Sequence, residues 1–248
     1  MSQPDRSGDE IFIVDNADPE WKTREYLREW SEFARSIDIA TGYFEIGALL
    51  ALDGYWQKLD GMHILMGDEV TARTHGAILA GLKARAEQIV DQSIEREKEK
   101  NDFLTGVAAI VQAIESGKIV CRVYAKRKFH AKAYINHSRS RVIGSRALVG
   151  SSNFTYPGLT DNIELNLNIR SEVDKLQAWF DEHWEAGDDV SADLLQVIQR
   201  HVMSVRCSLG LVLMTNFVSL VNYHELDTKM EDLAYSDCSL ETLAASHE

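Results

Sequence analysis

Short apolar segments alternate with longer amphipathic stretches through residues 11–201, and this alternation limits the fold more than any other feature. The stretch 19–36 places Trp21, Tyr26, Trp30 and Phe33 at helical spacing. Strands that alternate with helices predict an α/β fold in which helices cover both faces of the sheet. We expect strands at 11–14, 37–40, 62–66, 119–124, 130–135, 141–149 and 163–169. We expect helices at 19–36, from a turn at 41–42 to residue 59, at 74–115, at 173–185 and at 192–201.

Two polar pairs accompany neighbouring strand-like segments. His130 and Lys132 are two residues apart in one segment, and Ser151 and Asn153 follow the next. Residues i and i+2 of a strand point to the same face, so each pair is expected to project together. If the pairs meet, an imidazole lies beside one cation and two neutral hydrogen-bonding groups. That combination suits a phosphate ester, because imidazole attacks phosphorus while the lysine and the amide hold its oxygens.

The charge distribution supports a phosphate ligand at this place. The chain carries a net charge of −13, yet residues 116–160 contain nine cations and no Asp or Glu. A local basic segment in an acidic chain attracts an anion to one site, whereas the global charge argues against a general nucleic-acid coat. We expect a nucleic-acid backbone to bind Lys126, Arg127, Lys128, Arg139 and Arg141. The alternative is a solvated basic strand edge, which sheets use against aggregation.

These residues resemble the signature of the phospholipase D superfamily, H-x-K-x4-D followed by G-S-x-N or G-G-x-N. His130 and Lys132 match the first element, and the second matches Gly150, Ser151 and Asn153. Glu164 matches the acidic residue that follows the Asn in this family and orients the catalytic histidine. The resemblance is greatest to single-motif, nuclease-like members and to domains found ahead of helicase motors in bacterial and archaeal defence proteins.

The resemblance implies a phospholipase D-like mixed sheet flanked by helices on both faces. It also implies metal-independent phosphodiester cleavage through a phosphohistidine on His130, without a cofactor. Glu164 would accept the other ring N–H, Lys132 and Asn153 would stabilise the transition state, and Ser151 would be a lesser donor. We expect no metal site, because no His or Cys spacing typical of metal ligands occurs.

The chain has one H-x-K motif, whereas in-line displacement needs an acid opposite the nucleophile. We therefore expect a homodimer that completes the active site, with nucleic acid, DNA or RNA, as substrate and a role in defence, restriction or helicase-linked processing. The alternative is a non-catalytic nucleic-acid-binding module that works with a helicase partner. Hydrolysis of lipid headgroups is a third class.

One position departs from the family signature. The family Asp falls at His137, and no Asp or Glu lies near it in the sequence. The family Asp mainly supports structure, so its loss is compatible with activity. His137 itself is expected to be a surface turn residue. We also expect Trp179, Phe180 and Trp184 to belong to the core rather than to a base-stacking platform.

The rest of the sequence indicates the domain organisation. We expect a polar N-terminal tail at 1–10, the phospholipase D-like domain at 11–201 and a C-terminal appendage at 202–248 without an assigned role. No Walker-type phosphate loop, signal peptide or convincing membrane span occurs, so no membrane contact is expected. The cysteines, at 121, 207 and 238, lack disulfide-like spacing, which indicates a reducing, cytoplasmic environment.

Overall fold

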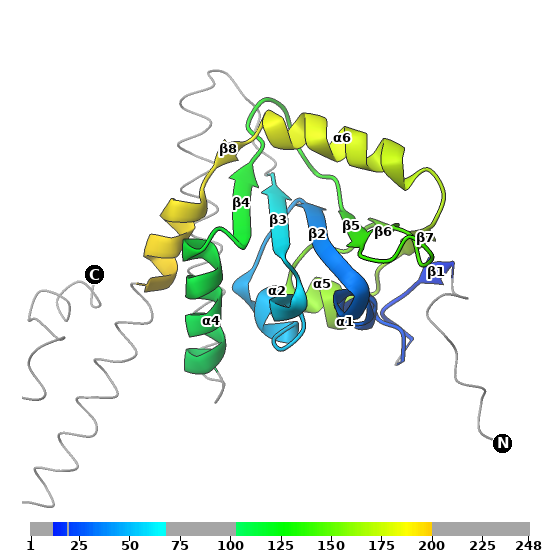
Figure 1. Ribbon diagram of the computed structural model, residues 1–248, viewed down its shortest axis with the longest axis horizontal. Helices are drawn as coiled ribbons and strands as arrows, with labels where there is room; N and C mark the ends of the chain where they lie inside the picture. Colours follow the sequence, from blue (N-terminus) through cyan, green and yellow to red (C-terminus); the bar gives the residue numbers. More distant parts are fainter. Residues whose placement is uncertain (1–11, 19, 68–102, 200–248) are drawn as a thin grey trace, which may run out of the picture. The chain divides into compact units, whose positions relative to one another are not determined.

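The computed structural model describes residues 12–18, 20–67 and 103–199. The chain divides into two units, Met1–Val197 and Ile198–Glu248, and the first contains every helix and strand named below. Eight strands of this unit form one mixed sheet in the order β1-β7-β6-β5-β2-β3-β4-β8 (Figure 1). The strands β2, β3 and β4 run parallel to one another, and all other neighbours are antiparallel.

The strands are short, and their bounds follow the buried apolar segments. They are β1 (Ile13–Val14), β2 (Ala34–Thr41), β3 (Gly61–Met66), β4 (Ile119–Val123), β5 (Ala133–Ser138), β6 (Arg146–Gly150), β7 (Asn166–Ile169) and β8 (Asp188–Asp189). The helices are α1 (Thr23–Phe33), α2 (Ile46–Ala51), the short 3-10 helix η2 (Trp56–Lys58), α4 (Phe103–Glu115), α5 (Tyr156–Thr160) and α6 (Val173–Glu185).

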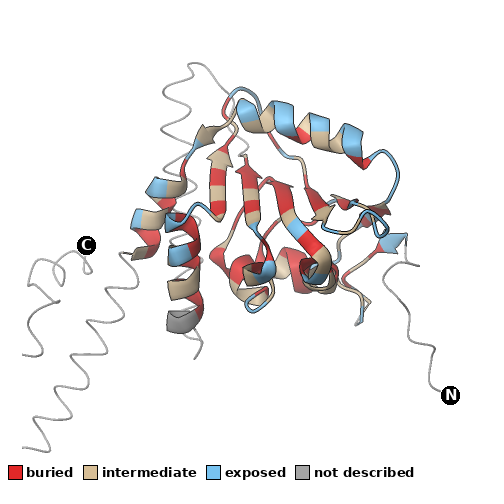
Figure 2. Cartoon of the chain, viewed as in Figure 1, coloured by how far each residue is buried: buried red, intermediate tan, exposed pale blue. Residues whose placement is uncertain are grey.

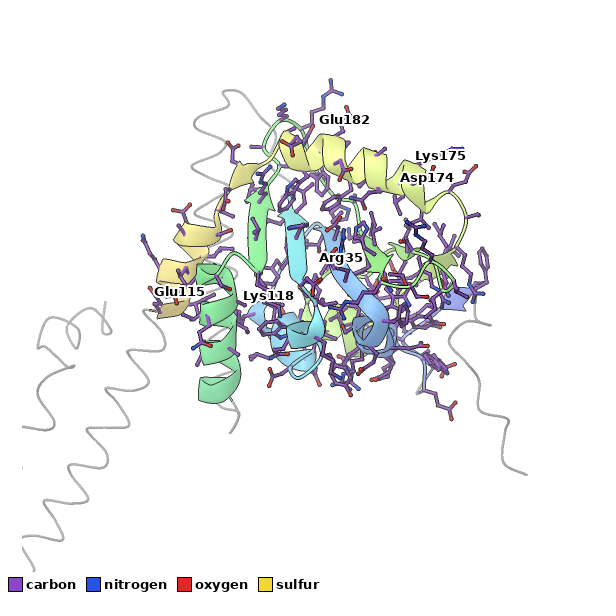
Figure 3. The ribbon with its side chains drawn as sticks, in the orientation of Figure 1. Arg35, Glu115, Lys118, Asp174, Lys175 and Glu182 are labelled. Carbon is purple, nitrogen blue, oxygen red and sulfur yellow. The ribbon has the colours of Figure 1, made fainter. Side chains whose placement is uncertain are left out.

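Helices cover both faces of the sheet, which confirms the predicted fold class. Figure 1 shows α6 on one side and α1, α2, α4 and α5 on the other. The inner side of α6 packs Val173 and Phe180 against strand residues such as Ala40 and Ile135, whereas Asp174, Lys175 and Glu182 project away from the sheet (Figure 3). The buried residues accordingly concentrate on the strands and on the inward sides of the helices (Figure 2).

The predicted element bounds are close for isolated elements and shifted where turns intervene. The helix predicted at 173–185 coincides with α6. The helix predicted to reach residue 59 ends at Ala51, because Gly54 turns the chain with a φ of 79° before η2. β6 begins at Arg146 rather than residue 141, since a turn at 141–143 and Gly144, with a φ of 74°, come first.

The strand predicted at 130–135 begins only at Ala133. Its partner β2 ends at Thr41, and Ala133 pairs with Ala40, so residues 130–132 lie beyond the last rung of this ladder. Four predicted segments, 1–10, 74–102, 200–201 and 202–248, lie outside the described residues. None of the described helices is long and apolar enough to cross a membrane.

A buried carboxylate, Asp38, connects four elements of the domain. It lies on β2 with a side chain only 6% exposed. One oxygen is 2.8 Å from Nδ1 of His63 on β3, and the other accepts from Nε2 of His137 on β5 and from Nε2 of Gln177 on α6, each at 2.8 Å. Three donors satisfy a charge whose burial without partners would be costly. The contact therefore fixes α6 over the central strands.

The expectation for His137 is wrong. This residue lies within β5, half-buried, and its ring contacts Asp38 rather than the solvent of a turn. Sequence spacing could not reveal the contact, because the two partners are 99 residues apart in the chain.

We predict that protonation of Asp38 lowers the free energy of unfolding at acid pH. Burial alone would raise the pKa of Asp38, but hydrogen bonds from His137 and His63 lower it below the ordinary value. The carboxylate therefore stabilises the folded state fully when the pH is above its unfolded pKa of about 4. This stabilisation is lost as the pH falls below that value. Asp38→Asn should lower the free energy of unfolding at pH 7 by about 1.5–3 kcal/mol, measured by urea denaturation.

The control is Asp60→Asn, which removes an exposed carboxylate paired with Arg139. An exposed pair contributes about 0–1 kcal/mol, so this variant should remain close to wild type. The difference between wild type and Asp38→Asn should shrink between pH 4 and pH 2. A difference that is constant across this range would contradict the assignment.

Candidate active site

His130 and Lys132 meet beyond the carboxyl ends of the parallel strands. Both lie in the segment that joins β4 to β5. The Lys132 Nζ atom is 2.8 Å from Nδ1 and 2.9 Å from Nε2 of His130, and it donates to the His130 carbonyl oxygen at 3.1 Å. Lys132 is buried and His130 is exposed. The ring is thus open to a ligand while the cation behind it is held in place, at the end of the sheet where open α/β folds bind ligands.

Asn153 is brought to the same ring by the chain that follows β2. A Cβ on Gly42 would lie 3.0 Å from Cδ2 of His130 and 3.2 Å from Oδ1 of Asn153, so both side chains touch this glycine. The Asn153 Oδ1 atom accepts from the backbone N–H of Tyr43 at 3.1 Å. Because the oxygen is engaged there, Nδ2 is the end of the amide that is directed to donate to an anion.

The glycine of the Gly-Ser-x-Asn segment is required by a close backbone approach. A Cβ on Gly150 would lie 2.0 Å from the carbonyl oxygen of Leu165. Gly150 also donates its N–H to the Lys132 carbonyl oxygen at 3.1 Å. This glycine therefore packs the start of the segment between β7 and the Lys132 backbone.

Ser151 and Glu164 pair with each other. The Ser151 hydroxyl donates to Oε2 of Glu164 and accepts from the backbone N–H of Leu165 at 3.0 Å. Oε1 of Glu164 accepts from Nδ2 of Asn162 at 3.3 Å. Ser151 thus positions the carboxylate with its only proton. The predicted bond between Glu164 and the His130 ring stays a prediction.

A buried polar network beneath this segment escaped the sequence analysis. Asn166 donates to Oγ of Ser152 at 2.8 Å and to Oγ1 of Thr23 at 3.1 Å, and all three residues are buried. Tyr134 donates its hydroxyl to the Ser152 carbonyl oxygen at 2.9 Å. Burial, followed by the negative charge of Glu164, raises the pKa of Tyr134 well above its ordinary value, which keeps the phenol a neutral donor. These bonds anchor the backbone between Ser151 and Asn153.

A pocket of about 400 Å³ opens at the His130–Lys132 pair. Its wall is formed by residues 130–133 before and at the start of β5, by Val149 and Gly150 of β6, and by Leu176 and Trp179 of α6. The lining therefore combines polar and apolar side chains. Pockets of this size and mixed character are typical of sites for small organic groups.

Residues 71–184 match the family model described as "Cardiolipin synthase, PLD-like domain". The match includes all of His130, Lys132, Ser151, Asn153 and Glu164. This segment is therefore phospholipase D-like. The predicted family resemblance is thereby confirmed.

Several solved structures are similar to this chain at low sequence identity. The chain is similar to Nuc, a phospholipase D family member from Salmonella typhimurium (17% identity, 71% of this chain and 95% of that chain, TM-score 0.41). It is similar to the archaeal chromatin protein TrmBL2 (15% identity, 77% of this chain and 57% of that chain, TM-score 0.42). It is also similar to phosphatidylserine synthase from Haemophilus influenzae Rd KW20 (14% identity, 73% of this chain and 39% of that chain, TM-score 0.42). The search of curated proteins found no match.

In the phospholipase D-like domain, the position of the signature Asp is taken by His137, and a carboxylate still lies beside it. His137 contacts Asp38 of the adjacent strand, so the acid comes from β2 instead of β5. A buried carboxylate thus supports the strand that follows the H-x-K segment. This is the structural role that the resemblance implies for the missing Asp.

The predicted nucleic-acid contacts fall into two groups. Lys126, Arg127 and Lys128 are exposed and directly precede Phe129 and the site. Arg139 and Arg141 follow the far end of β5, and Arg139 binds Oδ1 of Asp60 at 2.7 Å. Strand β5 alone separates the groups by about 16–20 Å. Only the first group is close in sequence to the pocket residue His130.

Among the described residues, no group of three or more His, Cys, Asp or Glu side chains could hold a metal ion. The polar side chains that line the pocket are instead a ring and an ammonium, which suit an anion.

We predict that Gly150→Ala disrupts the site by parting β6 from β7. The 2.0 Å approach to the Leu165 carbonyl oxygen forces a backbone shift, which we expect to cost about 3 kcal/mol in the free energy of unfolding. The control is Gly61→Ala, where the nearest atom lies at an ordinary 3.8 Å. Equal denaturation midpoints for the two variants would show that the close approach does not matter.

Proposed function

We propose that this chain is a metal-independent phosphodiesterase, and specifically a nuclease for DNA or RNA that acts through a phosphohistidine. The observation that carries the proposal is the contact between an exposed imidazole, His130, and the buried ammonium of Lys132 at a pocket of a phospholipase D-like domain. A nucleophile beside a fixed cation is the arrangement that a phosphate ester requires.

In the proposed reaction, a ring nitrogen of His130 attacks phosphorus. An N–P bond forms and the P–O bond to the leaving oxygen breaks. Lys132 and Nδ2 of Asn153 stabilise the charge on the non-bridging oxygens. Glu164, positioned by Ser151, accepts the other ring N–H. Water then attacks the phosphohistidine and gives a proton to the group that protonated the leaving oxygen, which releases the phosphate monoester and restores the ring. An imidazole nucleophile needs no metal-bound hydroxide, so the proposal includes no metal and no cofactor.

Nucleic acid is the substrate that the local charge favours. The exposed run Lys126, Arg127 and Lys128 leads directly into the site, where it would bind the phosphates next to the scissile one. Arg139 and Arg141 would contact a strand long enough to cross the sheet. As part of the same proposal, the chain acts in defence or in helicase-linked processing of nucleic acid, together with a helicase partner.

The second candidate is a non-catalytic module that grips the backbone of a nucleic acid. It is favoured by the Ser151 hydroxyl, whose only proton is engaged by Glu164 and is therefore not directed to a phosphate. The two candidates share Lys132 and Asn153 as phosphate contacts. They differ in one measurable respect, which is turnover at His130.

The leaving oxygen needs a proton, and we propose that His130 of a second copy supplies it. An apolar row starts at the pocket wall and crosses three strands: Val149 pairs with Leu167, which pairs with Ile13. Directly opposed residues share a face. Ile13 is 54% exposed and Leu167 is 37% exposed. An isologous contact along this row would bring the two sites together across a two-fold axis.

The first prediction of this proposal concerns chemistry. Wild type should cleave single- or double-stranded DNA or RNA in EDTA, His130→Ala should abolish cleavage, and Lys132→Ala should slow it by about 10²–10³-fold. Gel assays on labelled oligonucleotides measure all three. The control is Lys175→Ala on the outer side of α6. Cleavage that persists in His130→Ala would refute the mechanism. Binding without cleavage would select the non-catalytic module.

The second prediction concerns assembly. Leu167→Glu should place charges along the two-fold contact, so sedimentation should show a monomer where wild type is a dimer. Val142→Glu, at a residue that is 97% exposed, is the control and should remain dimeric. Excess His130→Ala chains mixed with wild type should suppress cleavage beyond dilution once subunits exchange. An active wild-type monomer would contradict the proposal and require another acid within the chain.

A further inference from the structure

The apolar residues that line the pocket have no part in the proposed chemistry. His130 and Lys132 line this pocket together with Val149, Leu176 and Trp179. Of the three aromatic residues expected in the core, Phe180 is fully buried with 1% exposure, but Trp179 is only half-buried and lies in the pocket wall. A large flat side chain therefore remains accessible next to the phosphate-binding pair.

Neighbouring rings hold Trp179 in place. The Phe129 ring lies at a centroid distance of 6.0 Å with an interplanar angle of 15°, and the His183 ring lies at 4.5 Å. His183 also contacts the Trp179 carbonyl oxygen through Nδ1 at 2.8 Å. Tyr124 packs against both Phe129 and His183. The indole is therefore supported by an aromatic cluster rather than free to rotate, and its accessible surface is preorganised for a planar ligand.

We infer that Trp179 is the stacking site for the nucleobase attached to the scissile phosphate. This inference deepens and rests on the proposed action on nucleic acid. A base that stacks on the indole would place its own phosphate near His130 and Lys132, which line the same pocket. Every base has a π-face, so the site would select for the presence of a base and not for its identity.

Charge complementarity favours a nucleotide over the acyl chain of a lipid. Three exposed cations, Lys126 to Lys128, immediately precede Phe129, whose ring supports Trp179. The aromatic wall is thus joined to a segment suited to further phosphates along a polymer. A single-phosphate lipid would leave these cations unused.

The test is equilibrium binding, so its outcome does not depend on whether the chain cleaves. The probe is fluorescein-labelled trithymidylate with phosphorothioate linkages, compared with an abasic trimer of equal charge. Fluorescence anisotropy in EDTA should show that wild type binds the base-containing trimer about 5–100-fold more tightly, the range expected for loss of base–aromatic stacking. Trp179→Phe should keep this preference, and Trp179→Leu, which remains apolar but has no ring, should lose it.

Glu182→Ala, on the outer side of α6, is the matched control and should behave as wild type. Equal affinity of wild type for both trimers would overturn the inference, as would an undiminished preference in Trp179→Leu. Binding to phosphatidylglycerol vesicles that depends on Trp179, without binding to either trimer, would overturn it in favour of a lipid. Failure of the cleavage assay alone would refute the proposed catalysis. The preference for the base-containing trimer would still decide whether Trp179 is a stacking site.

Discussion

The arrangement of the site depends on one buried charge, Asp38. Its carboxylate accepts from His63, His137 and Gln177, which belong to β3, β5 and α6. The Gln177 bond fixes the helix that carries Trp179 two residues later, while the His137 bond fixes the strand that follows Lys132. Two elements that line the pocket are therefore tied together through an acid that does not itself line it. Loss of that charge would alter the pocket through the separation of α6 from the sheet.

Local sequence patterns were sufficient for the layers of the fold but not for the ends of its strands. Helix α6 could be predicted because its apolar residues recur at helical spacing over 13 residues. The start of β5 could not, because it is decided by where β2 ends, and pairing partners are invisible in a single segment. Gly54 and Gly144 shifted two other elements, since a left-handed turn within a continuous pattern interrupts the element without changing its hydrophobicity.

The candidate site shows the same division between local and long-range information. The adjacent pair His130 and Lys132 could be found from spacing, whereas the contacts that position it come from distant segments. His137 with Asp38, and Asn166 with Thr23, are pairs separated by 99 and 143 residues. Trp179 was assigned to the core because its neighbours on the helix share its hydrophobicity. Periodicity identifies the inward side of a helix but not the place along it where the underlying sheet leaves a pocket.

The fixed orientation of Asn153 has a consequence for chemical ageing. The Tyr43 N–H holds Oδ1, so the amide nitrogen alone is directed at the site. Deamidation that yields aspartate would replace that nitrogen by an oxygen of almost the same size and would add a negative charge. The side chain would keep its shape, yet the proposed site would repel the anion that we expect it to bind. In aged samples, the proposed function would therefore decline with the aspartate formed, while measures of folding remained normal.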